Sequence, residues 1–179
     1  MRTEALGLPG CSLVHLDRFE DERGCFVKTY QRLAFEAAGM EPLEGETFYT
    51  VSHQGVLRGM HFQTPPSDLA KLVHCLAGRV LDVILDLRRS SPTYMQHRTV
   101  LLDGTQSTAV YLPHGIAHGF LALSDGATMA YQVSKPYNPS HDAGIRWDSF
   151  GFDWPIAQPL LSERDQRHPA LADFDSPFA

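Results

Sequence analysis

The sequence predicts an all-β protein built as a sandwich or a barrel, and three observations lead to this prediction. Short runs rich in β-branched, aromatic and leucine residues recur through the middle of the chain. The strings that separate these runs, such as SSPT, DGTQ and SDG, favour turns. The longest run, RVLDVILDLR, alternates in a way that suits a barrel whose interior is partly polar.

The predicted elements begin with a short helix, LAFEAAGM at residues 33–40, that ends at Gly39. Strands are expected at residues 71–76, 79–88, 97–102, 108–112, 119–123 and 128–134. From Trp154 onward, closely spaced prolines predict irregular structure with short helical turns. No linker, low-complexity tract or long repeat interrupts the chain, so residues 1–179 are expected to form a single domain.

The strand expected at residues 79–88 presents two different faces. Alternation places Val80, Asp82, Ile84 and Asp86 on one face, and leucines with Val83 on the other. If the first face lies inside a barrel, its carboxylates need cationic or hydrogen-bonding partners. The same pattern also fits a strand whose aspartates are exposed to solvent, and alternation alone does not choose between the two.

Composition and charge exclude several classes of protein. A formal net charge of -6 argues against nucleic acid as the main partner. No run approaches the roughly 18 apolar residues of a membrane-spanning helix, and the N-terminus lacks the apolar core of a secretory signal. The three cysteines have no CxxC spacing, so we expect reduced thiols and a cytoplasmic protein.

The string GVLRGMHFQ, residues 55–63, places a permanent cation and a titratable base in a strand-like segment. The titratable residues at strand-like positions are Arg58, His61, Lys71, His74, Asp82, His118 and Tyr131. Each of these alone is more often a hydrogen-bonded structural residue than a catalytic one. A base candidate, cations and a phenol in one predicted barrel together indicate a functional site, but their spacing does not show that the side chains converge.

Metal-dependent and nucleophilic chemistry are weakly supported by the motifs. A PxGxxH turn is present as PHGIAH, residues 113–118, but Gln63 stands where an HxH pair would place its second histidine. Two histidines without a carboxylate make a poor site for zinc or iron, so no metal is expected. The sequence contains no GxSxG elbow, Walker loop or GxGxxG fingerprint.

Long strings of the chain resemble one enzyme family. The matching strings include FEDERGCF, GVLRGMHFQ, YLPHGIAHGFLAL, AYQVSKPYNPSHDAGIRWD and LSERD, in order, over roughly residues 15–165. They resemble the dTDP-4-dehydrorhamnose 3,5-epimerase family. The resemblance implies a cupin-type jelly-roll β-barrel with short flanking helices, no metal or cofactor, and a nucleotide-diphospho-4-keto-6-deoxy sugar as substrate. It also implies a homodimer in which the N-terminal arm, residues 1–47, contacts the partner subunit.

The resemblance assigns roles to residues at the matching positions. His61 would be the general base, oriented by Asp165, and Tyr131 the opposing acid. Lys71 would meet the negative charge that develops on the sugar, with Arg58 beside it, and Gly59 would leave room for the ligand. The remaining substrate-binding positions would be His118, Arg23, Phe26, Glu46, Phe48, Gln63 and Tyr137, with Arg23 and Phe26 reaching the neighbouring subunit's site.

Departures from the family pattern leave the substrate open. Glu46 and Phe48 replace an amide pair that contacts substrate in the family, and Lys28 replaces a glutamate. Lys28 and Glu46 could form a compensating charge swap. A different nucleotide, a heptose, or inversion at one carbon therefore remain alternatives. So do a 3,4-ketoisomerase, disfavoured by the intact LRGMH and LSERD strings, and a non-catalytic sugar-binding protein if Glu46 and Phe48 block the pocket.

Overall fold

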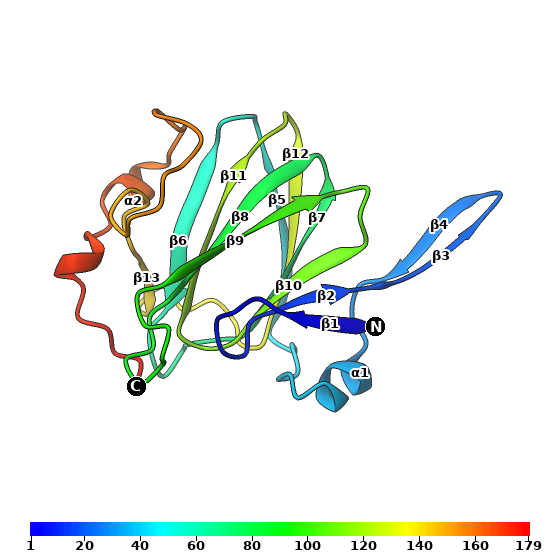
Figure 1. Cartoon of the computed structure of the whole chain (residues 1–179), viewed down its shortest axis with the longest axis horizontal. Coiled ribbons are helices and arrows are strands. Elements are labelled where there is room, and N and C mark those ends of the chain that lie inside the picture. Colours follow the sequence, from blue (N-terminus) through cyan, green and yellow to red (C-terminus); the bar gives the residue numbers. More distant parts are fainter.

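The protein is built from two antiparallel β-sheets that pack face to face, as a computed structural model of residues 1–179 shows (Figure 1). The six-stranded sheet has the order β1 (Arg2–Ala5), β2 (Ser12–His15), β10 (Thr108–Leu112), β7 (Lys71–Ala77), β12 (Ala127–Val133) and β5 (Glu46–Ser52). The five-stranded sheet has the order β13 (Asp142–Gly144), β6 (Leu57–Gln63), β11 (Ile116–Ala122), β8 (Arg79–Asp86) and β9 (His97–Asp103). This arrangement is a jelly-roll β-barrel of the cupin type.

All the strands predicted from the sequence are present, with their ends shifted by a few residues. The largest difference is in β11, which begins at Ile116 instead of residue 119, directly after Gly115 in a left-handed conformation (φ 77°). The run-based reasoning missed β5, because ETFYTVS mixes polar and apolar residues on an edge strand that is mostly exposed. Edge strands carry a weaker hydrophobic signal than central ones.

Strand β8 lies in the barrel with both faces buried, so the solvated alternative for its aspartates is wrong. Val80 and Ile84 pack between the two sheets, whereas Val83 and Leu85 pack on the opposite face. Both aspartates are fully buried. Asp86 accepts from Arg88 Nε at 2.9 Å, which supplies the partner that a buried carboxylate requires.

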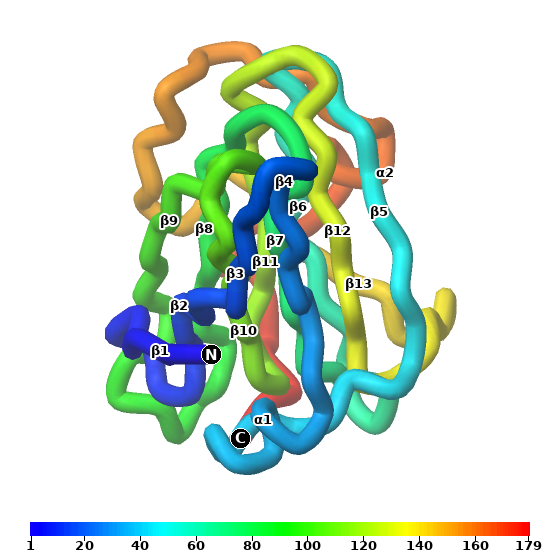
Figure 2. The backbone as a smooth tube through the Cα atoms, turned by 90° about the vertical axis from the view of Figure 1, so that its right-hand side faces the viewer, coloured from blue at the N-terminus to red at the C-terminus, as the bar shows by residue number.

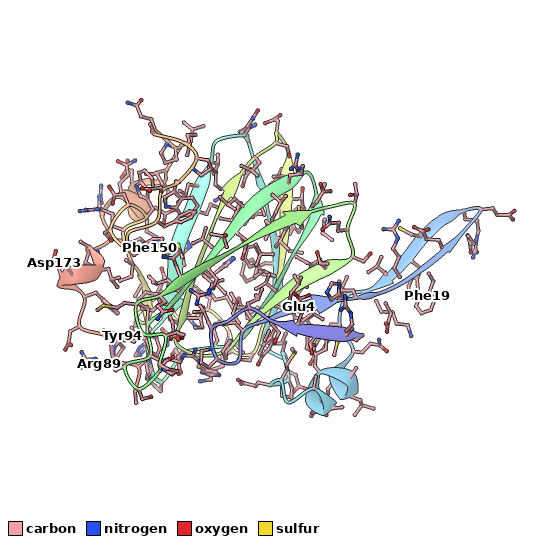
Figure 3. The ribbon with its side chains drawn as sticks, in the orientation of Figure 1. Glu4, Phe19, Arg89, Tyr94, Phe150 and Asp173 are labelled. Atoms are coloured by element: carbon pink, nitrogen blue, oxygen red, sulfur yellow. The ribbon has the colours of Figure 1, made fainter.

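The C-terminal segment covers the outer face of the five-stranded sheet. Phe150, Leu171 and Phe178 pack there against Met60 and Val83, and Figure 3 shows Phe150 on this side of the barrel. As predicted, the segment after Trp154 is irregular, with only the short helices α2 (Glu163–Gln166) and η1 (Leu171–Asp173). Ser162 precedes helix α2 and caps it, because its hydroxyl accepts the Asp165 N–H at 3.1 Å.

The N-terminal part divides into a packed portion and a protruding one. Strands β1 and β2 extend the six-stranded sheet, and helix α1 (Arg32–Ala37) buries Phe35 against it. The predicted helix is thus present, although it ends at Ala37, before Gly39 (φ 76°). The hairpin of β3 (Asp17–Asp21) and β4 (Gly24–Lys28) stands away from the barrel in Figure 1, and in Figure 2, viewed from that side, it lies in front of the sheets. None of the helices has the length and apolar character needed to cross a membrane.

Candidate active site

A cavity of about 470 Å³ opens between the two sheets. Most of the residues singled out from the sequence line it: Glu46, Phe48, Arg58, His61, Gln63, Lys71, His118, Tyr131 and Tyr137. They come from β5, β6, β7, β11, β12 and the loop after β12. Residues that are distant in the sequence therefore converge on one site, which the spacing alone could not show.

A bulge in β6 turns Arg58 and His61 toward the same cavity. His61 pairs with His118 and Arg58 pairs with Phe120. Between these two pairs, β6 therefore contains one residue more than β11. The extra residue reverses the strand's alternation and brings positions 58 and 61 onto one face. Gly59 lies in this bulge with φ 142°, and a Cβ there would come within 2.5 Å of the Gly119 backbone. The prediction that Gly59 leaves room for ligand is therefore wrong, because close packing of two strands requires the glycine.

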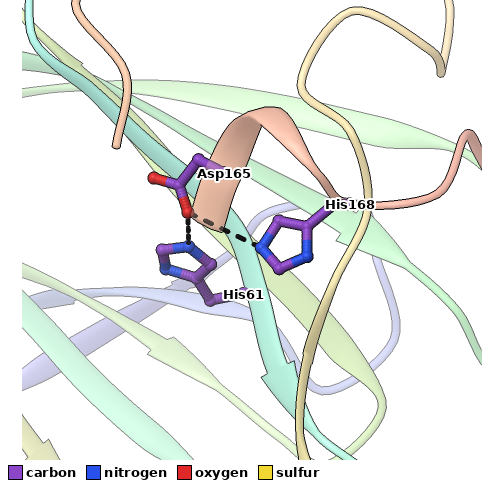
Figure 4. Close-up of side chains that lie close together, drawn as sticks. All are labelled: His61, Asp165 and His168. Atoms are coloured by element: carbon purple, nitrogen blue, oxygen red, sulfur yellow. Dashed lines mark hydrogen bonds and ion pairs between the residues drawn. The ribbon is translucent and has the colours of Figure 1, made fainter. Parts of the chain in front are cut away.

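His61 forms a hydrogen-bonded pair with a carboxylate from outside the barrel wall. Its Nε2 lies 2.5 Å from Oδ1 of Asp165, on helix α2 (Figure 4). Asp165 is only 3% exposed. A carboxylate accepts hydrogen bonds, so Nε2 carries the proton and Nδ1 keeps its lone pair. Asp165 thus fixes the tautomer in which His61 can act as a base.

Burial and neighbouring groups set the protonation of this pair. Burial lowers the pKa of His61, and the bond to Asp165 offsets only part of that effect. Burial also acts to raise the pKa of Asp165, but His168, His61 and Ser162 outweigh it and hold that pKa below its usual range. At neutral pH the pair therefore consists of a neutral imidazole and an ionised carboxylate, the state required for proton abstraction.

Tyr131 faces the cavity from the opposite sheet. It lies on β12, whereas His61 lies on β6, so the two residues stand on different walls. Burial raises the pKa of Tyr131 well above its ordinary value, which keeps the phenol protonated as a proton donor. The Phe48 ring stacks on the Tyr131 ring, with centroids 4.8 Å apart and planes 12° apart.

Two cations lie in the same cavity. Lys71 donates from Nζ to the His61 carbonyl oxygen at 3.1 Å. Burial lowers the pKa of Lys71 to about 8, against the opposing effects of Asp142 and Asp82, so the ammonium is still charged at neutral pH. Arg58 donates from Nε to Ser52 Oγ at 3.1 Å, which holds its guanidinium against β5. Such fixed charges can stabilise an oxyanion.

The mouth of the cavity carries acidic and aromatic groups. Glu46 Oε1 accepts the Tyr137 N–H at 3.0 Å, and the Tyr137 hydroxyl donates to Asp142 at 3.3 Å. Arg164 pairs with the same carboxylate at 3.0 Å. Sequence reasoning did not single out Asp142 or Arg164, although both lie within recognised strings, Asp142 in AYQVSKPYNPSHDAGIRWD and Arg164 in LSERD.

Gln63 lines the cavity and forms hydrogen bonds within the protein. Its Oε1 accepts the Asn138 N–H at 2.6 Å, and its Nε2 donates to the Ser67 carbonyl at 2.7 Å. The amide thus holds two loops together beside the cavity, and both ends of its head group are already engaged. Any contact of Gln63 with a ligand stays a prediction.

The predicted residues of the N-terminal hairpin do not approach the cavity of their own chain. Arg23 forms an ion pair with Asp21, and the exposed Phe26 ring lies 6.2 Å from that of Phe19. Lys28, on the same hairpin, forms no ion pair with Glu46, so the suggested charge swap is not present within one chain. The expectation that Arg23 and Phe26 reach a second subunit stays a prediction.

One cluster has residue types that suit a metal. Ligand atoms of His61, Asp165 and His168 all lie within 4.8 Å of one another. However, the separation of 2.5 Å between His61 and Asp165 is a hydrogen-bond distance that leaves no space for an ion between them. His118, from the PxGxxH turn, is bonded to Asp82 at 2.6 Å instead of joining this cluster. The residues therefore fit a hydrogen-bonded pair better than a metal centre.

A base and an acid on facing walls can remove a proton from one side of a carbon and return it on the other. With a buried ammonium beside them, they can also stabilise the anion formed in between. Fold and site together therefore define an acid–base isomerase on a cupin-type barrel.

Comparison with known proteins agrees with this class. The family model described as dTDP-4-dehydrorhamnose 3,5-epimerase matches residues 5–173. The dTDP-4-dehydrorhamnose 3,5-epimerase of Mycolicibacterium smegmatis is 40% identical to this chain over 86% of the chain and 77% of the relative. The dTDP-4-dehydrorhamnose 3-epimerase of Streptomyces niveus is also 40% identical, over 97% of this chain and 85% of the relative. The chain belongs to the dTDP-4-dehydrorhamnose 3,5-epimerase family.

A solved structure gives the same result in three dimensions. The dTDP-6-deoxy-D-glucose-3,5-epimerase of Legionella pneumophila, in complex with dTDP-4-keto-L-rhamnose, matches with a TM-score of 0.92 at 32% identity. The match covers 97% of this chain and 94% of that chain. The likeness therefore extends over both sheets and the C-terminal segment.

Proposed function

We propose that the protein epimerises a nucleotide-diphospho-4-keto-6-deoxy sugar at C3, C5 or both, without a redox cofactor. The observation that carries the proposal is the placement of His61 and Tyr131 on opposite walls of one cavity, with Lys71 between the sheets. The substrate class is supported by the relative whose solved structure contains dTDP-4-keto-L-rhamnose.

The mechanism begins with removal of a proton from a carbon next to the ketone. Such a C–H is a very weak acid, so neutral imidazole can remove its proton only if the enolate oxygen is stabilised. His61 takes the proton at Nδ1, and Asp165 stabilises the imidazolium that forms. Lys71 and Arg58 offer the positive charge that meets the oxyanion. Tyr131 then returns a proton to the opposite face, which inverts the carbon.

The open volume of the cavity argues against the non-catalytic alternative. Phe48 stacks on Tyr131 along the wall, and Glu46 lies beside Tyr137 at the mouth. The cavity still measures about 470 Å³ with these side chains in place, so they do not block it. A volume of this size is within the usual range for small-molecule sites, about 300–1,000 Å³.

Solvent exchange tests the proposal directly. The protein is incubated in deuterium oxide with dTDP-4-keto-6-deoxyglucose and with the corresponding sugar on other nucleotides, and label at C3 and C5 is followed by NMR. Label at both carbons shows that both are deprotonated and supports double inversion, and label at one supports a single-site epimerase. Relatives with either name are equally identical to this chain. A ketone found at C3 would identify a ketoisomerase. No exchange with any nucleotide would contradict the proposal.

The partner predicted for this protein is a second copy of the same chain. Phe19 and Phe26 are both more than half exposed on the protruding hairpin, and burying such a pair against a second copy is favourable. If Arg23 serves the neighbour's cavity, inactive Arg23→Ala and His61→Ala chains should recover activity when unfolded together and refolded as mixed dimers. A monomer in analytical ultracentrifugation, or no recovery, would contradict this assembly.

A further inference from the structure

A second histidine lies beside the catalytic pair and has no part in the steps above. His168 Nε2 is 3.6 Å from Asp165 Oδ1, the same oxygen that holds His61 (Figure 4). The ring of His168 meets the ring of His61 edge-on, with centroids 5.7 Å apart and planes 70° apart. The Asp165 carboxylate is therefore shared between two imidazoles.

The Nε2 atom of His168 is buried and faces the Asp165 carboxylate. The side chain is 11% exposed, and its Nε2 is buried without a hydrogen-bond partner inside normal distance. The nearest charged group that this nitrogen faces is the Asp165 carboxylate. A carboxylate repels a lone pair and attracts an N–H, so Nε2 must carry a proton. At 3.6 Å the contact is too long for a hydrogen bond and acts through electrostatic attraction.

The backbone around His168 keeps the ring in this position. Gly144 on β13 lies opposite His61 in the sheet register, and a Cβ on Gly144 would come within 2.4 Å of His168 Nε2. The residue after His168 is also fixed, because the Pro169 carbonyl accepts the Arg146 N–H at 2.8 Å. The imidazole is thus packed between β13 and Asp165.

We propose that His168 is a positioning residue. Its Nε2–H points at the Asp165 oxygen that bonds to His61, and it orients that carboxylate. The same N–H weakens the attraction of the carboxylate for a second proton on His61. The proposal rests on the proposed function, in which His61 must be a neutral base. The effect has the same sign if His168 is itself protonated, because a second cation also disfavours imidazolium on His61. Lys71 and Arg164, the cations that act on His61, remain in place in every variant below.

Replacement of His168 by Phe tests the proposal, because it keeps a ring and removes the N–H. The acid limb of the pH profile of kcat/KM should move upward by about half a pH unit, which is about a threefold loss of activity at any pH well down that limb. His168→Gln places an amide N–H near the same point and should restore the wild-type profile. An NMR titration of His61 without substrate should show the same upward shift of its pKa in His168→Phe and no shift in His168→Gln.

A second His–Asp pair supplies the control. His53 Nδ1 lies 2.9 Å from Asp125 Oδ1 at an exposed site away from the cavity, so His53→Phe should leave the pH profile unchanged. A uniform loss of activity in His168→Phe and His168→Gln, with the acid limb and the His61 titration unmoved, would overturn the proposal. Failure of the proposed function looks different, because the wild-type protein would then show no solvent exchange into any of the nucleotide sugars.

Discussion

Two histidine–aspartate pairs have their imidazoles in the lining of the same cavity, and they differ in the exposure of the histidine and in the element that supplies the aspartate. In one pair, His61 is 28% exposed and its aspartate comes from helix α2, outside the barrel. In the other, His118 is 4% exposed and bonds at 2.6 Å to Asp82, which lies between the sheets. Only the first pair leaves an accessible imidazole backed by a buried carboxylate. Accessibility, not the bond itself, therefore separates a base from a structural histidine.

The largest effect that tests this comparison comes from the first pair. His61→Ala removes the base while the barrel wall stays intact, so solvent exchange into substrate should fall by about 100- to 10,000-fold. Circular dichroism should show an unchanged fold. Wild-type exchange in this variant would assign the base elsewhere.

The matching change in the second pair should affect stability more than chemistry. His118→Leu leaves Asp82 buried and unpaired, and one Asp82 oxygen already has no partner. The free energy of unfolding should fall by about 3–5 kcal/mol, measured by urea denaturation. Replacing Asp82 by Leu as well should recover part of the loss. A stability equal to wild type would show that the pair is not a structural one.

The pH dependence sharpens the distinction between base and cation. His61 works unprotonated with a lowered pKa, so activity should be lost only as pH falls below about 6.5, the ordinary imidazole value. Lys71 works protonated, so activity should be lost as pH rises through about 8, tenfold for each further unit. Measurement of kcat/KM from pH 5 to 10 checks both limbs. An alkaline limb that survives Lys71→Met would contradict the role of Lys71.

As the pH rises, Lys71 should also change activity and stability in opposite directions. Its folded pKa, about 8, lies below that of the unfolded chain, so the unfolded state binds more protons between the two values. The contribution of Lys71 to stability therefore increases from about pH 8 to the ordinary lysine value near 10.4, the range in which activity declines. Urea denaturation at pH 8 and pH 10, compared with Lys71→Met, measures this contribution.

The smallest effect concerns the acid on the opposite wall. Phe48 packs flat on Tyr131, and such aromatic contacts contribute about 0.5–1.5 kcal/mol. Phe48→Leu should therefore reduce inversion by about two- to tenfold and leave deprotonation by His61 nearly unchanged. The ratio of inverted product to deuterium exchange measures this directly. An equal fall in both rates would show that Phe48 acts on substrate binding instead.

The sequence predicted the barrel, and the residues that gather at the cavity, better than the local geometry that brings these residues together. Runs of apolar residues identified the central strands, and the resemblance supplied roles for His61, Asp165 and Tyr131. Alternation could not reveal the β6 bulge, because simple period-two counting places Arg58 and His61 on opposite faces. It could not reveal His168 either, since its contact with His61 depends on how the C-terminal segment folds back over the sheet.

Asp165 belongs to the C-terminal segment that covers the barrel, and the ribosome synthesises this segment after every strand of the barrel. A nascent chain that has left the ribosome only as far as β13 already possesses every strand of the barrel, including the one that bears His61. It still lacks the carboxylate that fixes the imidazole tautomer, which follows only with helix α2. The polypeptide thus acquires the carboxylate that orients His61 only when the segment with α2 has docked, and a fragment that ends before α2 lacks it.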